Sequence, residues 1–147
     1  MKKLLLILLL LCFLPAACAE SLPLVTLDFT PGAQTGGTVF AAVPSDNGTA
    51  LLLAQYGTLT LEMGDLNGNE KFAYLDDVLP ECPEQMEVIK AGDILLFGNK
   101  CLVIFYQDTV SPFNYTRVGH VVQPEMLESA LGNSDVTVQL IFAPVQN

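Results

Sequence analysis

Short apolar or alternating segments recur along most of the chain, with turn-forming residues between them. There are eight, at residues 24–29, 38–43, 58–63, 71–75, 93–97, 101–106, 117–122 and 136–142. The third alternates strictly between polar and apolar side chains, which places one face of a strand in water and the other against a core. Several short strands separated by turn signals are typical of an antiparallel sandwich or barrel.

Two dipeptides indicate tight hairpins between neighbouring segments. Asn67-Gly68 stands between the third and fourth segments, and Gly98-Asn99 stands between the fifth and sixth. Both pairs favour the left-handed backbone that short hairpin turns need. The strands on either side of each turn are therefore expected to pair antiparallel.

A first short helix is predicted before the third strand. Ser45 and Asp46, which follow Pro44, can cap a helix that runs through residues 50–54. Gly57 lies where such a helix can end.

A second short helix is predicted between the last two strands. Pro124 suits its first position and Gly132 lies just past its end. Its apolar face would consist of Met126, Leu127, Ala130 and Leu131. Eight strands and two short helices predict a mainly β fold: a closed eight-stranded barrel with a helix covering each open end.

Residues 1–19 have the features of a secretory signal peptide. A basic dipeptide is followed by an apolar run over residues 4–14 and by small residues up to Ala19. The apolar stretch is shorter than the roughly 20 residues that a helix needs to span a bilayer. Cleavage before Glu20 would leave residues 20–147 as a single exported domain, secreted or periplasmic, without a membrane span.

A competing interpretation is lipid attachment at Cys18 after signal removal. Pro15 stands three residues before this cysteine, where lipoprotein sites carry a branched aliphatic residue. The polar tether of a lipoprotein is also missing, since residues 21–23 lead directly into an apolar strand. Cleavage before Glu20 is the favoured interpretation.

The composition indicates one folded domain with an acidic surface. Hydrophobic residues make up 51% of the 147 residues and charged residues 15%, which excludes an intrinsically disordered chain. Six Lys and Arg against 16 Asp and Glu give a net charge of −10, which argues against a nucleic-acid partner. Carboxylates crowd residues 76–87, and this run is interpreted as a solvated face.

Two cysteines, Cys82 and Cys101, remain in the mature chain. In an exported protein they can form a disulfide that closes a loop of about 20 residues and stabilises the fold by about 3 kcal/mol. In the alternative, Cys101 is a buried small hydrophobe within its apolar run. The sequence leaves both open.

No metal site is predicted. A zinc site is disfavoured because no third cysteine or histidine lies nearby. The segment from Asp65 to Glu70 superficially resembles the start of a calcium loop, but Gly68 falls at the fourth position instead of the sixth. A tight hairpin explains these residues without a metal.

Residues suited to catalysis are scarce. His120 is the only histidine and Arg117 the only arginine, and the chain has neither a G-x-S-x-G elbow nor a G-x-x-x-x-G-K-[ST] loop. His120 is interpreted as a surface residue of a strand, because the sequence reveals no partner that would orient it as a base. No cofactor is predicted, and a non-enzymatic role is favoured.

The loop that joins the sixth and seventh strands has the composition of a ligand site. It combines aromatic, amide and hydroxyl groups with the single guanidinium, as a peptide or small-ligand groove does. The candidate ligand-binding residues are Tyr106, Gln107, Phe113, Tyr115 and Arg117. In the alternative, the aromatic side chains cover the core and the arginine pairs with a nearby carboxylate.

Four blocks in order resemble the bacterial cyclophilin-like fold family. They are GDLNGNEK (residues 64–71), AGDILLF (91–97), CLVIFY (101–106) and YTRVGHV (115–121), within a similarity that covers roughly residues 40–142. The resemblance implies an eight-stranded barrel capped by two helices. It implies no established activity, because the family is named for its fold.

True cyclophilins isomerise X-Pro bonds, and the resemblance can be examined residue by residue. Their C-terminal F-G-K-V block resembles V-G-H-V at residues 118–121, and Tyr115 stands where they carry a pocket histidine. Their catalytic arginine lies much earlier in the chain, where this sequence has Lys71 but no arginine.

We therefore expect a binding module for a peptide or small molecule, without catalysis. The alternatives are an extracytoplasmic peptidyl-prolyl isomerase and an interaction domain with no small ligand. The sequence identifies neither the partner nor the oligomeric state.

Overall fold

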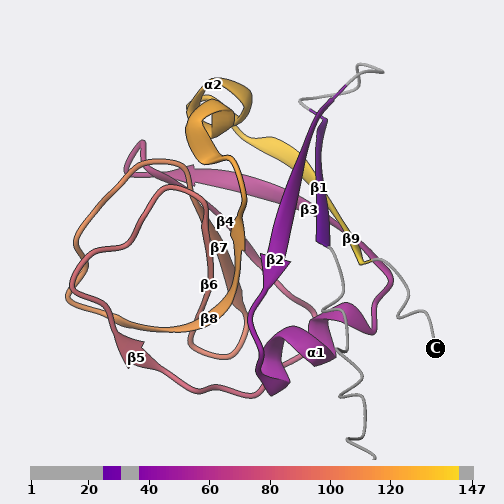
Figure 1. Cartoon of the computed structure of the whole chain (residues 1–147), viewed down its shortest axis with the longest axis vertical. Helices are drawn as coiled ribbons and strands as arrows, with labels where there is room; N and C mark the ends of the chain where they lie inside the picture. Colours follow the sequence, from indigo (N-terminus) through magenta and orange to yellow (C-terminus); the bar gives the residue numbers. More distant parts are fainter. Residues whose placement is uncertain (1–24, 31–36, 143–147) are drawn as a thin grey trace, which may run out of the picture.

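A computed structural model describes residues 25–30 and 37–142, with side chains described from residue 37 onward. The predicted signal peptide and the alternative lipid site at Cys18 lie outside these residues. The described residues form nine strands and two short helical regions (Figure 1). The strands are β1 (Val25–Thr30), β2 (Thr38–Pro44), β3 (Thr58–Leu66), β4 (Glu70–Tyr74), β5 (Glu84–Gln85), β6 (Asp93–Phe97), β7 (Cys101–Phe105), β8 (Asn114–Val121) and β9 (Val136–Phe142).

The strands form one curved antiparallel sheet in the order β2-β1-β9-β3-β4-β7-β6-β8, with β5 attached to β8. The ends of this order meet along a short ladder that pairs Ala42 with Val121 and Pro44 with Gly119. A mainly β fold with two short helices is confirmed. A barrel closed along whole strands is not confirmed, because β2 and β8 pair only over this short ladder, which we call the seam.

Gly119 is required at the seam by close contact. A Cβ atom at this position would lie 2.8 Å from the backbone oxygen of Val43, closer than real side chains approach. The glycine therefore allows β2 and β8 to meet.

Both predicted hairpins are present. β3 and β4 pair across a turn in which Asn67 and Gly68 have φ angles of 55° and 68°. β6 and β7 pair across a turn in which Gly98 has a φ of 58°. Asn67, Gly68 and Gly98 are left-handed as the dipeptides predicted, whereas Asn99 is not.

The first helix, α1 (Gly48–Ala54), differs from the prediction in its cap. The Asn47 side chain accepts a hydrogen bond of 2.9 Å from the backbone N–H of Ala50 and so caps the helix. The expected caps, Ser45 and Asp46, lie before the cap position, which is residue 47 because the helix begins at residue 48.

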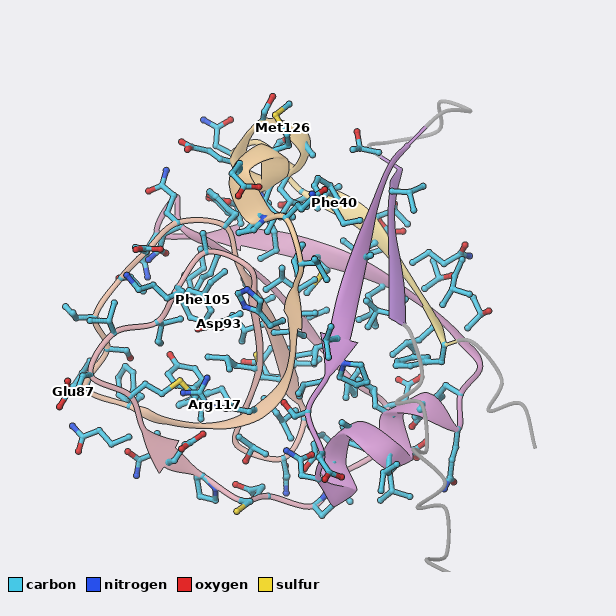
Figure 2. All side chains as sticks on the ribbon, viewed as in Figure 1. Phe40, Glu87, Asp93, Phe105, Arg117 and Met126 are labelled. Atoms are coloured by element: carbon cyan, nitrogen blue, oxygen red, sulfur yellow. The ribbon has the colours of Figure 1, made fainter. Side chains whose placement is uncertain are left out.

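The second helical region begins with a 3-10 turn, η1 (Pro124–Met126), and continues as α2 (Leu127–Leu131). Leu127 and Leu131 are buried as predicted, but Met126 is exposed (Figure 2). The tighter first turn rotates Met126 away from the face that an uninterrupted α-helix would have given it. α1 and α2 lie at opposite ends of the curved sheet (Figure 1).

The wall formed by β4, β6, β7 and β8 carries apolar side chains on both faces. Leu102, Ile104 and Tyr106 belong to the main core inside the sheet. Their neighbours Val103 and Phe105 belong to a second cluster on the outer face. This second cluster also contains Met86, Ile89, Leu95, Cys101 and Tyr115.

Strand β5 was not anticipated. It pairs Glu84 with Tyr115 and Gln85 with Asn114, within the acidic run that the composition assigned to solvent. The carboxylates of this run are exposed as expected. The segment that includes β5 and the residues after it nevertheless contributes the buried Met86 and Ile89 to the second cluster, on the outer face. The run thus serves both as a solvated face and as a cover for the wall.

Candidate functional site

A cavity of about 460 Å³ lies on the outer face of the wall, over β4 and β7. We call it the outer pocket. Its lining consists of Leu66, Asn67, Asn69, Glu70, Phe72, Tyr74, Phe97, Cys101, Val103, Phe105, Thr109, Val110, Ser111, Pro112, Phe113 and Tyr115. The volume falls in the range of pockets that bind small molecules.

The floor of the outer pocket follows from the alternation of side chains along two paired strands. Glu70 lies directly opposite Phe105 in the ladder between β4 and β7, and Phe72 lies opposite Val103. Successive side chains of a strand point to opposite faces, so these residues share the outer face while their neighbours enter the core. Directly opposed side chains lie close enough to form a continuous surface.

Aromatic rings form most of the pocket wall. The ring centre of Phe97 lies 5.6 Å from that of Phe113 and 5.5 Å from that of Tyr115. Tyr115 also meets Phe105 edge to face at 5.9 Å. Such pairs contribute about 0.5–1.5 kcal/mol each beyond the burial of their area. Each ring therefore holds its neighbours in place.

The rim of the pocket is apolar and open to solvent. Its large exposed side chains are Leu66, Tyr74, Phe97, Val110 and Phe113. Scattered exposed hydrophobic residues are ordinary, whereas a group of them around one cavity is typical of a binding surface.

The loop at residues 109–113 is fixed on both sides. Before it, Asp108 accepts hydrogen bonds from the Lys90 ammonium at 2.7 Å and from the Ala91 N–H at 2.9 Å. These donors, Lys90 first, hold the pKa of the Asp108 carboxyl below its usual value. Within the loop, the Ser111 hydroxyl lies 3.3 Å from the Tyr115 hydroxyl. The loop is thus tied to the strands that carry the rest of the pocket.

Glu70 is the one charged residue in the pocket lining. Its residue surface is 9% exposed, and no hydrogen bond to its carboxyl is present among the described residues. Burial raises the pKa of the Glu70 carboxyl above its usual value, and the negative charge of Asp65 adds to the rise. Beside it, the side-chain oxygen of Asn69 is buried without a hydrogen-bond partner in this part of the chain. The polar edge of the pocket therefore carries one carboxylate without a hydrogen-bond partner in the described chain.

Two of the five predicted ligand-binding residues, Phe113 and Tyr115, line the outer pocket. Tyr106 points to the other face of the wall. Its hydroxyl donates a 2.7 Å hydrogen bond to Asp65, and its ring lies 5.3 Å from the Lys71 ammonium nitrogen. Burial, followed by this hydrogen bond, raises the pKa of the Tyr106 hydroxyl well above its usual value.

Gln107 and Arg117 also lie outside the pocket lining. The amide of Gln107 donates to the Glu128 carboxylate at 2.7 Å. The Arg117 Nε donates to the Glu84 carboxylate at 2.6 Å, and both side chains are about half exposed. Figure 2 shows Arg117 and Phe105 at separate places on the half of the molecule that holds β4 to β8. The structure thus divides the predicted site.

Lys71 is fully buried next to the pocket floor but on the inner face. Its ammonium donates 2.7 Å hydrogen bonds to the Asp65 carboxylate and to the Ser134 backbone oxygen. The hydrogen bonds from Lys71 and then Tyr106 lower the pKa of the Asp65 carboxyl. Asp65, the first residue of the apparent calcium loop, therefore pairs with a lysine.

His120 has an orienting partner that the sequence did not reveal. Its Nδ1 lies 3.1 Å from the buried carboxylate of Asp93, and its ring is half exposed. The pair lies outside the outer pocket lining. The surface position of His120 on β8 agrees with its interpretation from the sequence as a surface residue of a strand.

Cys82 and Cys101 are both free thiols in this structure. Cys82 is exposed, while Cys101 is buried in the pocket wall. Burial raises the pKa of the Cys101 thiol, and the negative charge of Glu70 adds to the rise. The disulfide that the sequence left open is not formed here, and Cys101 packs as a small hydrophobe.

The described residues hold no group of three or more His, Cys, Asp or Glu side chains arranged to bind a metal ion. In the same part of the chain, no helix has both the length and the apolar character to cross a bilayer.

The main residues that the sequence analysis missed are Glu70, Phe72, Phe97 and Phe105. Each lies in a predicted strand or next to one, where hydrophobic residues are expected to serve the core. Alternation could have separated Phe105 from Tyr106, but it gives no absolute assignment of the outer face.

A family model described as the cyclophilin-like family matches residues 33–141. The solved structure of McbB in complex with tryptophan superposes on this chain with a TM-score of 0.62 at 15% sequence identity. The match covers 84% of this chain and 45% of the McbB chain. No curated protein sequence matches the chain.

Proposed function

The chain belongs to the cyclophilin-like family, and from this premise we propose that its domain binds a small molecule with an aromatic or extended apolar body in the outer pocket. The observation that carries the proposal is the aromatic-lined cavity on the outer face of the wall formed by β4, β6, β7 and β8, whose rim leaves large apolar side chains in water. Covering such a rim by a ligand removes apolar area from water, worth about 25 cal/mol per Å².

The fold neighbour supports a small ligand over a peptide. McbB was solved in complex with tryptophan, a molecule that a cavity of about 460 Å³ can accommodate. This chain spans less than half of McbB, so the activity of that protein is not carried over. A peptide that inserts one aromatic side chain would use the same rim, and it is an outcome that the experiment below distinguishes.

An interaction domain without a small ligand would present a flat surface with Arg117 paired outward. Arg117 is indeed paired with Glu84, but the wall is not flat, because it carries the outer pocket, whose lining does not include Arg117. The binding surface would therefore depend on aromatic contacts and not on the guanidinium.

The experiment is a thermal-shift and calorimetric screen of neutral aromatic molecules, beginning with indole and 3-methylindole. We expect saturable binding to the wild type and about fivefold to tenfold weaker binding to Phe113→Ala, which removes one exposed rim ring. Tyr56→Ala is the matched control, because Tyr56 is an exposed aromatic residue outside the outer pocket.

Three outcomes decide the proposal. Loss of affinity in Phe113→Ala but not in Tyr56→Ala supports it. Equal binding by all three proteins would place the ligand elsewhere, and binding only of peptides with an aromatic residue would reassign the pocket to a peptide partner.

We also propose that the domain acts outside the cytoplasm, supported by the signal-peptide pattern of residues 1–19. Intact-mass measurement of the protein recovered from its native host is expected to give a chain that begins at Glu20. A diacylglyceryl group on Cys18 would contradict this and indicate a lipoprotein.

A further inference from the structure

The outer pocket contains a negatively charged side chain that binding of a purely apolar ligand would not require. Glu70, a residue that is only 9% exposed, places one carboxylate on an otherwise uncharged floor. No lysine, arginine or histidine lines the pocket. Burying a carboxylate without a partner is costly, so a group of this kind is expected to have a use.

The side chains around Glu70 do not satisfy it. Within residues 37–142 no donor forms a hydrogen bond with the Glu70 carboxyl. The nearby Asp65 carboxylate, in contrast, accepts hydrogen bonds from both Lys71 and Tyr106. Lys71 follows Glu70 directly but faces the core, where its ammonium already contacts Asp65 and Ser134. Lys71 therefore donates its hydrogen bonds to other acceptors and does not pair with Glu70.

A second acceptor without a partner differs from Glu70 in its exposure. The buried side-chain oxygen of Asn69 has no hydrogen-bond partner in the described chain, and it too belongs to the pocket lining. That oxygen has almost no exposed surface, whereas the Glu70 carboxyl oxygens are not fully buried, so Glu70 is the acceptor that a ligand can reach. A primary ammonium carries three donors and no acceptor, which suits a carboxylate.

Aromatic side chains beside a carboxylate favour the same ligand. The faces of Phe and Tyr rings attract cations, more strongly when the cation is shielded from water. Phe72 and Phe105 flank the Glu70 position on the floor: Phe72 is two residues along β4, and Phe105 is its cross-strand partner. The net charge of −10 would also attract cations toward the protein over a longer range.

We propose that the outer pocket selects aromatic amines, with the ligand's ammonium bound by Glu70 and its ring held among the aromatic residues of the wall. This inference rests on the proposed function and names the ligand class for the same pocket. An aromatic acid is disfavoured, because the pocket lining offers its carboxylate no cation.

A set of indoles that differ mainly in charge tests the proposal by calorimetry at pH 7. Tryptamine is a cation, tryptophan a zwitterion, 3-methylindole neutral and indole-3-propionate an anion. We expect tryptamine to bind about 10- to 100-fold more tightly than 3-methylindole, as for one hydrogen bond to a charged partner in a shielded site. Tryptophan should fall between them, and indole-3-propionate should bind most weakly.

Glu70→Gln is the decisive variant, because it keeps the shape of the side chain and removes the charge. We expect tryptamine to lose most of its advantage and bind within about threefold of 3-methylindole. 3-Methylindole should bind the variant at least as well as the wild type, which also shows that the pocket is intact. Glu125→Gln is the control: it makes the same change in net charge at an exposed site outside the pocket.

The outcomes separate the two proposals. If no indole binds, both fail. If 3-methylindole binds the wild type as tightly as tryptamine does, or Glu70→Gln leaves the affinity for tryptamine unchanged, the ligand class is overturned and an apolar pocket remains. If Glu125→Gln lowers the affinity as much as Glu70→Gln, the effect is one of net charge, and the role of Glu70 is overturned.

Discussion

Glu70 and Lys71 are adjacent in the sequence and are both buried, yet they lie on opposite faces of the same wall. Lys71 faces the core and has a carboxylate, a backbone oxygen and an aromatic ring around its ammonium. Glu70 faces the outer pocket and has no hydrogen bond from the rest of the described chain. Removing a partner from a buried charge destabilises a fold, whereas the unpartnered Glu70 at the cavity is the basis of the ligand class proposed above.

Removing Lys71 is expected to break the inner side of this comparison. Lys71→Met keeps the apolar stem but removes the only cation paired with Asp65 among the described residues, which leaves that carboxylate with the Tyr106 hydroxyl, and it removes the side-chain donor to the Ser134 oxygen. Removing one partner of a buried ion pair typically costs about 3–5 kcal/mol, and we expect about 3 kcal/mol because Asp65 is partly exposed. Urea unfolding measures it. A loss below about 1 kcal/mol would show that the ion pair contributes little.

The acid dependence of stability is expected to follow Asp65. Its pKa is lowered in the folded state, so its contribution is present above the ordinary carboxyl pKa of about 3.9. That contribution is lost as the pH falls through the lowered folded value. Unfolding measured between pH 7 and pH 2 should show a loss of about 2 kcal/mol for these charged hydrogen bonds. In Lys71→Met the fall in unfolding free energy between pH 7 and pH 2 should be smaller than in the wild type. If the fall is unchanged, carboxylates other than Asp65 cause it.

The sequence predicted the wall better than it predicted the faces of the wall. Turn residues and alternation located the strands that carry the pocket, because those patterns depend only on local geometry. Which face of a strand meets the core depends on pairing register, and a shift of one residue exchanges the two faces. For this reason Tyr106 was chosen for the site although its neighbour Phe105 lines the pocket.

Arg117 and Glu70 illustrate two other limits of sequence analysis. Arg117 was expected to donate to a ligand, but it pairs with Glu84 on β5, a strand of two residues within an acidic run. A strand this short leaves no periodic pattern to recognise. Glu70 entered the sequence analysis only as the end of the apparent calcium loop, and only the ladder with β7 places it on a pocket floor.

Glu70→Gln is expected to stabilise the protein without a ligand. The pKa of Glu70 is raised in the folded state, so the ionised carboxylate weakens the fold as the pH rises through that value. At pH 7 the variant should gain about 1 kcal/mol, a typical cost of an unsatisfied buried group. Below the ordinary glutamate pKa of about 4.3 the gain should vanish. This sign is opposite to that of Asp65, and a loss of stability at pH 7 would mean that Glu70 has an intramolecular role.

Arg117→Ala is expected to have the smallest effect. The ion pair with Glu84 joins two side chains that are about half exposed, and such pairs contribute about 0–1 kcal/mol. We expect a change in unfolding free energy within about 0.5 kcal/mol and no change in tryptamine affinity.

A tetrapeptide proline-isomerisation assay should give the uncatalysed rate for both wild type and variant, since no arginine lines the outer pocket to polarise a proline amide. Exchange without catalysis takes tens to hundreds of seconds, so even weak catalysis would be visible. A cyclophilin-like rate in the wild type that Arg117→Ala abolished would make Arg117 a catalytic donor and move the functional site from the outer pocket to the surface beside β5.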